Sequence, residues 1–428
     1  MLYDIIIIGS GPNGLLFNYY ITKYYPYLKT LLITKKKTEF HCTYGVFFSH
    51  INKTWFLDHI PYKYLKVYNT KVSCPKLNNP LMYNNRLISS EKYVLLDNEI
   101  YNFLIDSIEN HSNSDIKEID VIDIQKNNRL SNVLYYSDNI LKSLQSKIVI
   151  EATGHHSPIG VSYPKYNINY QVFYGKEINC YYPHGIKDVI LLDWYNPHKN
   201  NNIPSFAYII PLNSYTILIE ETILITNNIS DSLYDYLESR LNKRIKDYKI
   251  SIKKVVRIEK NTIILNRTIP KFDSISFGIG PAGNMLNPLS GYTIGYNIYH
   301  IPEIAKLIIE NRFNTEDVYR KYWNINRRII YNLNLIGTKL MLTFDQNKFC
   351  NFHSHFFKNY DSNLFKILFL NCNVDNSIYK LFVSSRVLLN YPFYYILTII
   401  KLLIIEFVNI YYLVSSIVIL FTIFIIYR

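Results

Sequence analysis

The sequence predicts an α/β protein with a Rossmann-like domain, a second domain built on a β-sheet, and a helical C-terminal region. Three observations lead to this prediction. The chain begins with a continuous apolar run that ends in a glycine-rich turn before a helical segment. Several strand-like segments alternate between Ile168 and Leu265. After Asn314 the chain has mostly helical patterns.

The N-terminal segment has the pattern of one βαβ unit. The apolar run "LYDIIIIG" is typical of a central parallel strand, and the helical "LLFNYYITKYY" and the strand "KTLLIT" follow it. Between strand and helix, Gly9, Gly11 and Gly14 form a Gly-x-Gly-x-x-Gly turn, with Pro12 inside it. The first glycine permits the turn, the second lets a pyrophosphate approach, and the third lets the helix pack closely. The turn predicts dinucleotide binding at a helix N-terminus, the alternative being a structural turn without phosphate.

An acidic residue that binds a ribose is expected at the end of the second strand. Thr34 stands there, lysines follow it, and Glu39 comes only later. This turn alone therefore leaves NAD, NADP and FAD as alternatives.

Further glycine turns follow later strands. Glu151-Ala152-Thr153-Gly154 follows "SKIVI", and "GIGPAG" begins at Gly278. The pattern resembles two-dinucleotide-type flavoproteins, and three such turns favour FAD over a lone nicotinamide. The predicted cofactor-binding residues are Gly9, Gly11, Pro12, Gly14, Thr34, Ala152, Thr153, Gly154, Gly278, Gly280, Met285, Pro288, Gly291 and Tyr292.

Composition limits the class of partner. The 428 residues carry a formal net charge of +13, but no basic block or RNA-binding signature accompanies it, so we expect an anionic membrane surface rather than nucleic acid. The five cysteines are scattered without a Cys-x-x-Cys pair, which predicts neither a zinc site nor a disulfide framework and suits a reducing compartment.

The apolar C-terminal tail predicts a membrane anchor. No charged residue lies between Phe407 and Tyr427, a length that can span a bilayer, and a buried core helix is the alternative. The preceding run from Tyr391 to Ile405 contains Lys401 and predicts an interfacial segment or half of a hairpin. No secretory signal or transit peptide is visible at the start of the sequence.

Two adjacent acids occur inside one apolar strand. The segment "YTILIEETIL", from Tyr215 to Leu224, contains Glu220 and Glu221. Successive side chains of a strand point to opposite faces, so the two carboxyls cannot serve the same face.

At this point the chain resembles the lycopene cyclases of plants and cyanobacteria. The resemblance is carried by "HCTYGVFFSHINKTWFLDHI", "INYQVFYGKEI", "VILLDWYNPH", "IPSFAYIIPLNSYTILIEET" and "GIGPAGNMLNPLSGYTIGYNIY". It continues through "VYRKYWNINRRIIYNL" and "LFVSSRVLLNYPFYYIL", to about residue 398. The strand that ends in Glu-Glu-Thr is specific, because general flavin monooxygenases have the glycine turns without it.

The resemblance implies an acid-initiated cyclisation in carotenoid biosynthesis. A general acid protonates the terminal alkene of lycopene, the neighbouring double bond attacks the carbocation, and loss of a proton leaves a β or an ε ring. The reaction has no net redox change, but it uses reduced FAD, with NAD(P)H as the electron source. Glu220 matches the proton donor of the Glu-Glu-Thr motif, Glu221 is the second acid, and Asp193 is a further candidate that could orient Glu220.

Such an acid must stay protonated near neutral pH, which an apolar pocket and a second carboxylate favour. Aromatic faces can stabilise the cation, although ordinary core packing is the alternative for each ring. The predicted substrate pocket consists of Tyr170, Phe173, Tyr174, Trp194, Phe206 and Tyr208.

The chain departs from the family pattern at several positions. Phe47 replaces a Trp, Ser49 and His50 replace an acidic pair, and Asn287 replaces a His. Two rival functions follow. One is a related flavin-dependent prenyl reductase or monooxygenase, and the other is a catalytically degenerate flavin-binding membrane protein.

The predicted organisation has four parts. Residues 1–75, 105–160 and 258–313 form the FAD/NAD(P)-binding domain, and residues 76–104 and 161–257 form the substrate-binding sheet domain. Residues 314–390 form the helical region, and residues 391–428 form the membrane-anchoring tail. We expect a plastid membrane or a bacterial cytoplasmic or photosynthetic membrane. No metal is expected.

Overall fold

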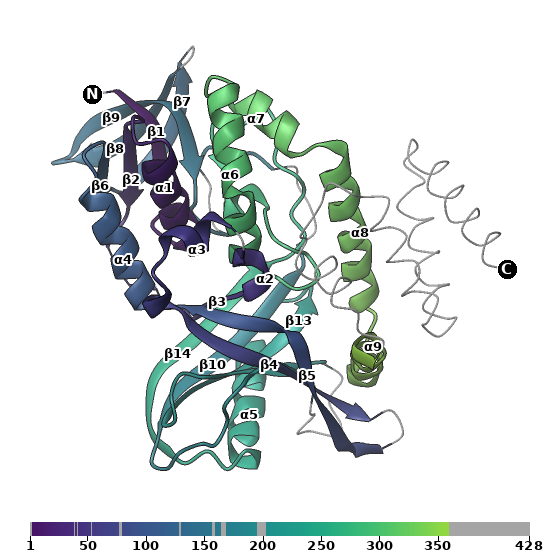
Figure 1. The fold of residues 1–428 in the computed structure, drawn as a ribbon. Helices are drawn as coiled ribbons and strands as arrows, with labels where there is room; N and C mark the ends of the chain where they lie inside the picture. The colour runs from purple at the N-terminus through teal and green to yellow at the C-terminus, as the bar shows by residue number, and fades with distance from the viewer. Residues whose placement is uncertain are drawn as a thin grey trace, which may run out of the picture.

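The computed structural model describes residues 2–358, apart from residues 38, 41, 53, 77–78, 128–129, 156–158, 164–167 and 195–202. Two β-sheets form the body of the protein (Figure 1). The first has the order β6-β2-β1-β9-β8-β7, with β15 beside β9, and the second has the order β14-β10-β13-β12-β11-β4-β5-β3. The α/β fold class with a Rossmann-like part is therefore confirmed.

The first sheet contains the strands of the predicted dinucleotide-binding unit. They are β1 (Leu2–Ile8), β2 (Thr30–Thr34), β6 (Ser114–Glu118), β7 (Val121–Asn127), β8 (Leu130–Ser137), β9 (Ile140–Glu151) and β15 (Phe277–Gly278). Strand β1 pairs in parallel with β2 and β9, and β15 pairs in parallel with β9. The carboxyl ends of these strands therefore lie at one edge of the sheet.

Both faces of β1 are buried, as its continuous apolar run predicts. Ile5 and Ile7 join the core under α1 (Pro12–Tyr24), α4 (Asn98–Glu109) and α6 (Ile294–Glu310). Ile6 and Ile8 pack on the other side, in a cluster with Ile124 and Val133 of the hairpin β7–β8.

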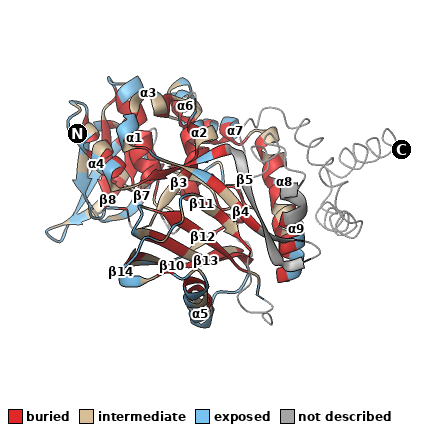
Figure 2. Ribbon diagram, turned by 60° about the horizontal axis from the view of Figure 1, so that its bottom comes forward, coloured by how far each residue is buried: buried red, intermediate tan, exposed pale blue. Residues whose placement is uncertain are grey.

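The second sheet is mostly antiparallel. Its strands are β3 (Tyr44–Phe47), β4 (Lys66–Lys76), β5 (Asn79–Leu96), β10 (Tyr170–Cys180), β11 (Val189–Asp193), β12 (Phe206–Pro211), β13 (Thr216–Thr226) and β14 (Ile252–Ile264). Helix α5 (Asp231–Asp247) covers one face, where Leu237 and Leu241 pack on Ile217 and Ile219. The central strands of this sheet are largely buried (Figure 2).

The remaining helices connect and cover the two sheets. Short helices α2 (Phe48–Ile51), α3 (Trp55–His59) and η1 (Tyr62–Tyr64) follow β3, and η2 (Gly280–Gly283) follows β15. The predicted C-terminal helices are α7 (Thr315–Tyr322), α8 (Ile325–Met341) and α9 (Gln346–Lys358). Residues from α8 and α9 pack on the face of the second sheet opposite α5.

The predicted membrane tail, residues 391–428, lies outside the described residues, as do residues 359–390 of the predicted helical region. Within the described part of the chain, no helix has both the length and the apolar character needed to cross a bilayer.

The sheets divide the chain differently from the predicted domain limits. Strands β3 and β4 belong to the second sheet although they precede residue 76, and β14 crosses the predicted limit at residue 258. Helix α4 begins within the predicted substrate segment and crosses its limit at residue 104, yet the helix packs on α1. An apolar strand pattern indicates that a strand is buried, but it does not indicate which sheet contains the strand. Local sequence was therefore insufficient to predict these domain boundaries.

Candidate active site

The three glycine turns meet at the carboxyl edge of the first sheet, because each follows one of the neighbouring strands β1, β9 and β15. A Cβ at Gly9 would lie 2.5 Å from the Ala152 carbonyl oxygen, and a Cβ at Gly14 would lie 1.9 Å from the Gly9 oxygen. In the third turn, a Cβ at Gly278 would lie 2.5 Å from the Ala282 oxygen. The turns are too tightly packed for side chains at these positions.

Other positions in the same turns are open. A Cβ at Gly11 or Gly154 would meet no atom within 4 Å. Helix α1 begins beside Gly11 with Pro12 in its first turn, and it has neither a capping side chain nor an acidic residue there. The buried Oδ1 atom of Asn13 has no hydrogen-bond partner. An open glycine before an uncapped helix N-terminus fits the pyrophosphate of a dinucleotide.

Thr34, at the position where a ribose-binding acid was expected, has a neutral hydroxyl. Thr34 Oγ1 lies 2.7 Å from Ser10 Oγ and donates to the Lys36 carbonyl at 2.9 Å. Glu39 accepts a hydrogen bond of 2.7 Å from Asn98, at the start of α4. Thr34, the last residue of β2, therefore lies beside the first glycine turn.

The segment from Met285 to Tyr292 runs from the third glycine turn to the second sheet. At one end, the Met285 amide donates to the Gly280 carbonyl at 2.8 Å. At the other end, Gly291 has a φ of +73° and would place a Cβ 2.5 Å from Gln171 Oε1 of β10. Pro288 is buried within this segment. Residues that the sequence analysis predicts to bind a cofactor therefore connect the second sheet to the edge of the first sheet that carries the glycine turns.

Glu220 lies in β13 on the face of the second sheet that is opposite α5. Its cross-strand neighbours are Tyr208 on β12 and Gly175 on β10. A Cβ at Gly175 would be only 3.3 Å from Glu220 Cβ, so this glycine leaves room for the acid. Thr222 Oγ1 donates to Glu220 Oε1 at 2.7 Å.

The Glu220 carboxyl favours its protonated form. Desolvation by surrounding protein, followed by the negative charge of Glu259, raises its pKa to about 8, and the hydrogen bond from Thr222 opposes this shift. The side chain nevertheless remains partly accessible. At pH 7 Glu220 is therefore mostly a neutral acid that can donate a proton.

Aromatic rings surround this acid in a chain of edge-on contacts. The rings of Tyr93 and Tyr208 are 6.0 Å apart, those of Phe47 and Tyr93 are 5.4 Å apart, and those of Phe47 and Tyr292 are 5.0 Å apart. A negative charge on Glu220 would raise the pKa values of Tyr93, Tyr208 and Tyr292. The hydroxyls of all three tyrosines are therefore close enough to interact electrostatically with Glu220. Phe173 joins the same face because it pairs with Thr222.

Glu221 points to the opposite face and is fully buried. Arg244 Nε donates to it at 2.7 Å, Arg240 Nε at 3.1 Å, and the Ser205 hydroxyl at 2.5 Å. Burial alone would raise the pKa of Glu221, but the two guanidinium groups hold it below its ordinary value. Glu221 is therefore an ionised carboxylate and is unsuited to donate a proton.

Asp193 belongs to the same buried network. Its carboxylate accepts 2.8 Å hydrogen bonds from Arg244 Nη1 and from the Tyr248 hydroxyl. It therefore faces α5, whereas Glu220 faces the other side of the sheet. Asp193 is placed to hold Arg244 rather than to orient Glu220.

The predicted aromatic pocket divides between the two faces. Trp194 and Phe206 lie with Tyr208 on the Glu220 side, and Trp194 stacks on Phe349 of α9 at 5.3 Å. Tyr170 and Tyr174 instead pack in the cluster beneath α5. Their assignment to the same pocket needs correction, because alternation along β10 turns them away from the face that carries Phe173.

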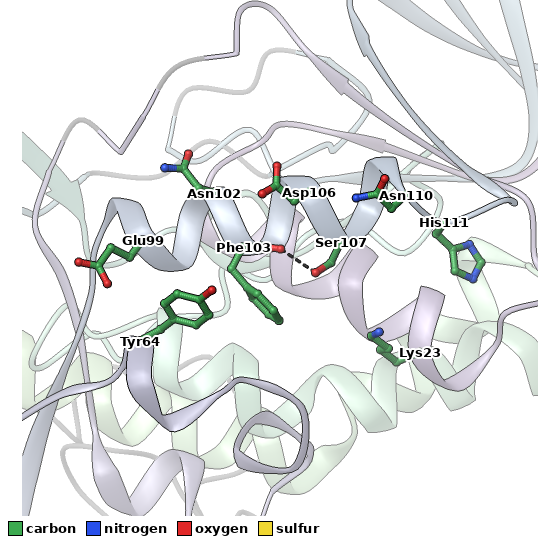
Figure 3. A pocket seen from close by; sticks show the side chains of 9 residues that line it. All are labelled: Lys23, Tyr64, Glu99, Asn102, Phe103, Asp106, Ser107, Asn110 and His111. Carbon is green, nitrogen blue, oxygen red and sulfur yellow. Dashed lines mark hydrogen bonds between the residues drawn. The ribbon is translucent and has the colours of Figure 1, made fainter.

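An open groove of about 700 Å³ lies elsewhere, along α4. Lys23, Tyr64 and His111 contribute to its walls together with polar residues of α4 (Figure 3). None of its lining residues belongs to a glycine turn or to the face around Glu220. The groove is therefore separate from the candidate active site.

The chain matches the family profile described as "Lycopene cyclase protein" over residues 4–370. It belongs to the lycopene cyclase family. Among curated relatives, lycopene beta cyclase of Arabidopsis thaliana is 27% identical over 237 residues, which cover 50% of this chain and 46% of that enzyme. Capsanthin/capsorubin synthase of Capsicum annuum is 23% identical over 368 residues, covering 80% of this chain and 70% of that protein. The chain thus spans about half the length of some cyclases that it matches.

Solved structures show the same fold at low identity. A geranylgeranyl bacteriochlorophyll reductase-like protein from Thermoplasma acidophilum has a TM-score of 0.63 and 16% identity, covering 82% of this chain and 90% of that one. The flavin-dependent brominase Bmp2 has a TM-score of 0.56 and 16% identity, covering 84% and 90%. The lycopene cyclase family member described here therefore has the fold of this wider group of flavoproteins.

Sequence reasoning missed three residues that lie around Glu220. Phe47 occupies a position where the lycopene cyclase pattern has a Trp, and this aromatic position could have identified it as a residue of the site. Tyr93 lies in β5, which has no local motif. Glu259 lies in the charged segment "IKKVVRIEKNTII", which resembles an exposed edge strand, although its side chain is only 2% exposed.

Proposed function

We propose that this protein is a lycopene cyclase that forms β or ε rings by acid-initiated, redox-neutral cyclisation with reduced FAD bound. The observation that carries this proposal is the contrast between the two adjacent acids. Glu220 is a neutral carboxyl among aromatic rings, whereas Glu221 is an anion locked by arginines on the other face. Family membership and the fold shared with flavoproteins support the same reaction class.

In the proposed reaction, Glu220 transfers its proton to the terminal alkene of the substrate. The neighbouring double bond attacks the resulting carbocation and closes the ring, and loss of one proton from the ring restores neutrality. Tyr93 and Tyr208, which interact electrostatically with Glu220, and Phe47, which contacts Tyr93, provide aromatic rings of the kind that stabilise positive charge. Their bulk also limits access of water, which would otherwise capture the cation as an alcohol.

The glycine turns would hold the cofactor. Gly11 and the start of α1 would receive the pyrophosphate, Gly154 leaves open space nearby, and Thr34 would contact a ribose. When bound and reduced, FAD supplies an electron-rich ring system, and we propose NAD(P)H as its electron source. A carotenoid substrate places the reaction at a membrane, and the chloroplast and chromoplast relatives favour a plastid.

Replacing Gly11 with alanine should weaken flavin binding about tenfold or more without unfolding the protein. The Cβ has room in the protein itself but would stand where the pyrophosphate approaches. Flavin retained after purification and far-UV circular dichroism would be measured together. Gly14→Ala is the matched comparison, because its Cβ meets the Gly9 carbonyl and should reduce stability as well. Full flavin retention by the Gly11 variant would contradict this placement of the cofactor.

The function can be tested in a bacterial host that accumulates lycopene. We expect the expressed protein to convert lycopene into products with one or two β or ε rings, identified by pigment chromatography. Lycopene that persists beside well-expressed, flavin-loaded protein would refute the proposal. Net consumption of nicotinamide in proportion to product would instead indicate a reductase or monooxygenase.

A further inference from the structure

A second buried carboxyl, Glu259, lies in register with Glu220 across three strands. Glu259 on β14 pairs with Gly175 on β10, and Gly175 pairs with Glu220 on β13. Directly paired residues of antiparallel strands project to the same face. Because Gly175 contributes no side chain, the row places two acids on one face with a glycine between them.

Hydrogen bonds fix the Glu259 side chain. The Thr43 amide donates to both carboxylate oxygens at 3.1 Å, and its hydroxyl donates to Oε1 at 2.8 Å. Arg257 Nη2 lies 2.8 Å from the same Oε1. These donors satisfy an anion, and they tie β14 to the segment that leads into β3.

Other ionisable groups also face this row. Glu177 of β10 shares Arg257 with Glu259, at 3.0 Å from Nη2. Burial raises the pKa of Glu259, while Arg257 and Thr43 oppose that shift. Burial also raises the pKa of Cys42 to about 11, so this thiol is neutral near pH 7. Among the described residues, Tyr93, Tyr208 and Tyr292 also interact electrostatically with Glu220, and Tyr44 with Glu259, and burial raises the pKa values of all four hydroxyls.

We propose that Glu259 is a positioning residue for the acid step: its carboxylate, fixed by Thr43 and Arg257, disfavours negative charge on Glu220 and so retains the proton that Glu220 delivers. This inference rests on the proposed function, in which Glu220 is the proton donor. It gives a chemical role to the row Glu259–Gly175–Glu220, which no local motif reveals.

Glu259→Gln tests the role of the charge. Glutamine can keep Oε1, which accepts from Thr43 and Arg257, but it removes the negative charge. We expect Glu220 to titrate about one pH unit lower in this variant. The alkaline limb of the cyclisation rate should move to lower pH by the same amount.

The titration can be measured without turnover. Infrared spectra would follow the protonated carboxyl stretch against pH, and subtraction of spectra from matched Glu220→Gln proteins would isolate Glu220. Glu259→Asp keeps the charge on a shorter side chain, so its Glu220 titration should lie between those of the native protein and Glu259→Gln. Glu177→Gln is the matched control, because it removes another carboxylate that contacts Arg257 and should leave the Glu220 titration unchanged.

The outcomes separate this inference from the proposed function. An unchanged Glu220 titration in folded, flavin-loaded Glu259→Gln protein overturns the inference. If that variant does not fold, an unchanged Glu220 titration in folded Glu259→Met protein, which also lacks the charge, overturns it instead. A shift to lower pH supports it, whether or not the variant forms product. Failure of the native protein to cyclise lycopene would refute the proposed function while leaving the measured coupling of the two carboxyls intact.

Discussion

Replacing Glu220 with glutamine should lower the cyclisation rate by about 100-fold or more while the fold and flavin binding are retained. Glutamine has the same shape and can accept the Thr222 hydrogen bond, but it has no acidic proton to transfer to an alkene. Initial rates would be measured on purified, flavin-loaded protein with lycopene supplied in liposomes. The expected loss is large because ring closure begins only after protonation.

The pH dependence gives a second readout of the same change. Native activity should fall as pH rises through about 8, because Glu220 then loses the proton that it donates. The residual activity of Glu220→Gln should lack this limb. Glu221→Gln is not a suitable control, because it disrupts the buried ion pairs, whereas Glu177→Gln changes a carboxyl on the neighbouring strand. A Glu220→Gln variant with native rates would transfer the acid role to another group.

Stability should respond to Glu220 in the same pH range. The pKa of Glu220 in the folded protein, about 8, lies above the ordinary value of 4.5. The stability that its neutral form contributes is therefore fully present below pH 4.5 and is lost as pH rises through about 8. The free energy of unfolding of Glu220→Gln, measured by chemical denaturation, should not show this decline with pH. The variant should therefore be more stable relative to the native protein at alkaline pH than at acidic pH.

Replacing Arg244 with methionine should reduce the free energy of unfolding by about 3–5 kcal/mol. Arg244 is fully buried between Glu221 and Asp193, with Nε 2.7 Å from the first carboxylate and Nη1 2.8 Å from the second. Methionine fills much of the volume but leaves two buried carboxylates without this partner. Chemical denaturation at pH 7 would measure the loss. Lys243→Met is the matched control on α5, because Lys243 makes an exposed ion pair with Asp247 and should change stability by about 0.5 kcal/mol or less.

The sign of the pH effect identifies the cause. The folded-state pKa of Glu221 is lowered, so its contribution to stability is present above its ordinary value of 4.5 and is lost as pH falls further. Without Arg244, burial should favour the protonated form of Glu221, so the stability deficit of Arg244→Met should shrink as pH falls. A deficit that is the same at pH 4 and pH 7 would show that lost packing, rather than unpaired charge, explains the destabilisation.

Local sequence determined the features that depend on neighbouring residues in the chain. The apolar run before Gly9 and the glycines at positions 11 and 14 were sufficient to predict the strand, the turn and the helix, because sterics and backbone geometry act over a few residues. Strand alternation was sufficient to predict that Glu220 and Glu221 point to opposite faces. The Glu-Glu-Thr strand also indicated the family.

Only the tertiary structure decided what covers each face. The order of strands in the second sheet brings Glu259 into the same row as Glu220 and Tyr208, although Glu259 lies on a strand beyond α5 in the chain. Helix α5 supplies Arg240 and Arg244 to Glu221, which makes that carboxyl an anion while its neighbour stays neutral. Adjacent residues of one chemical type acquired opposite protonation states because pKa depends on desolvation and nearby charge, and both are set by contacts between distant segments.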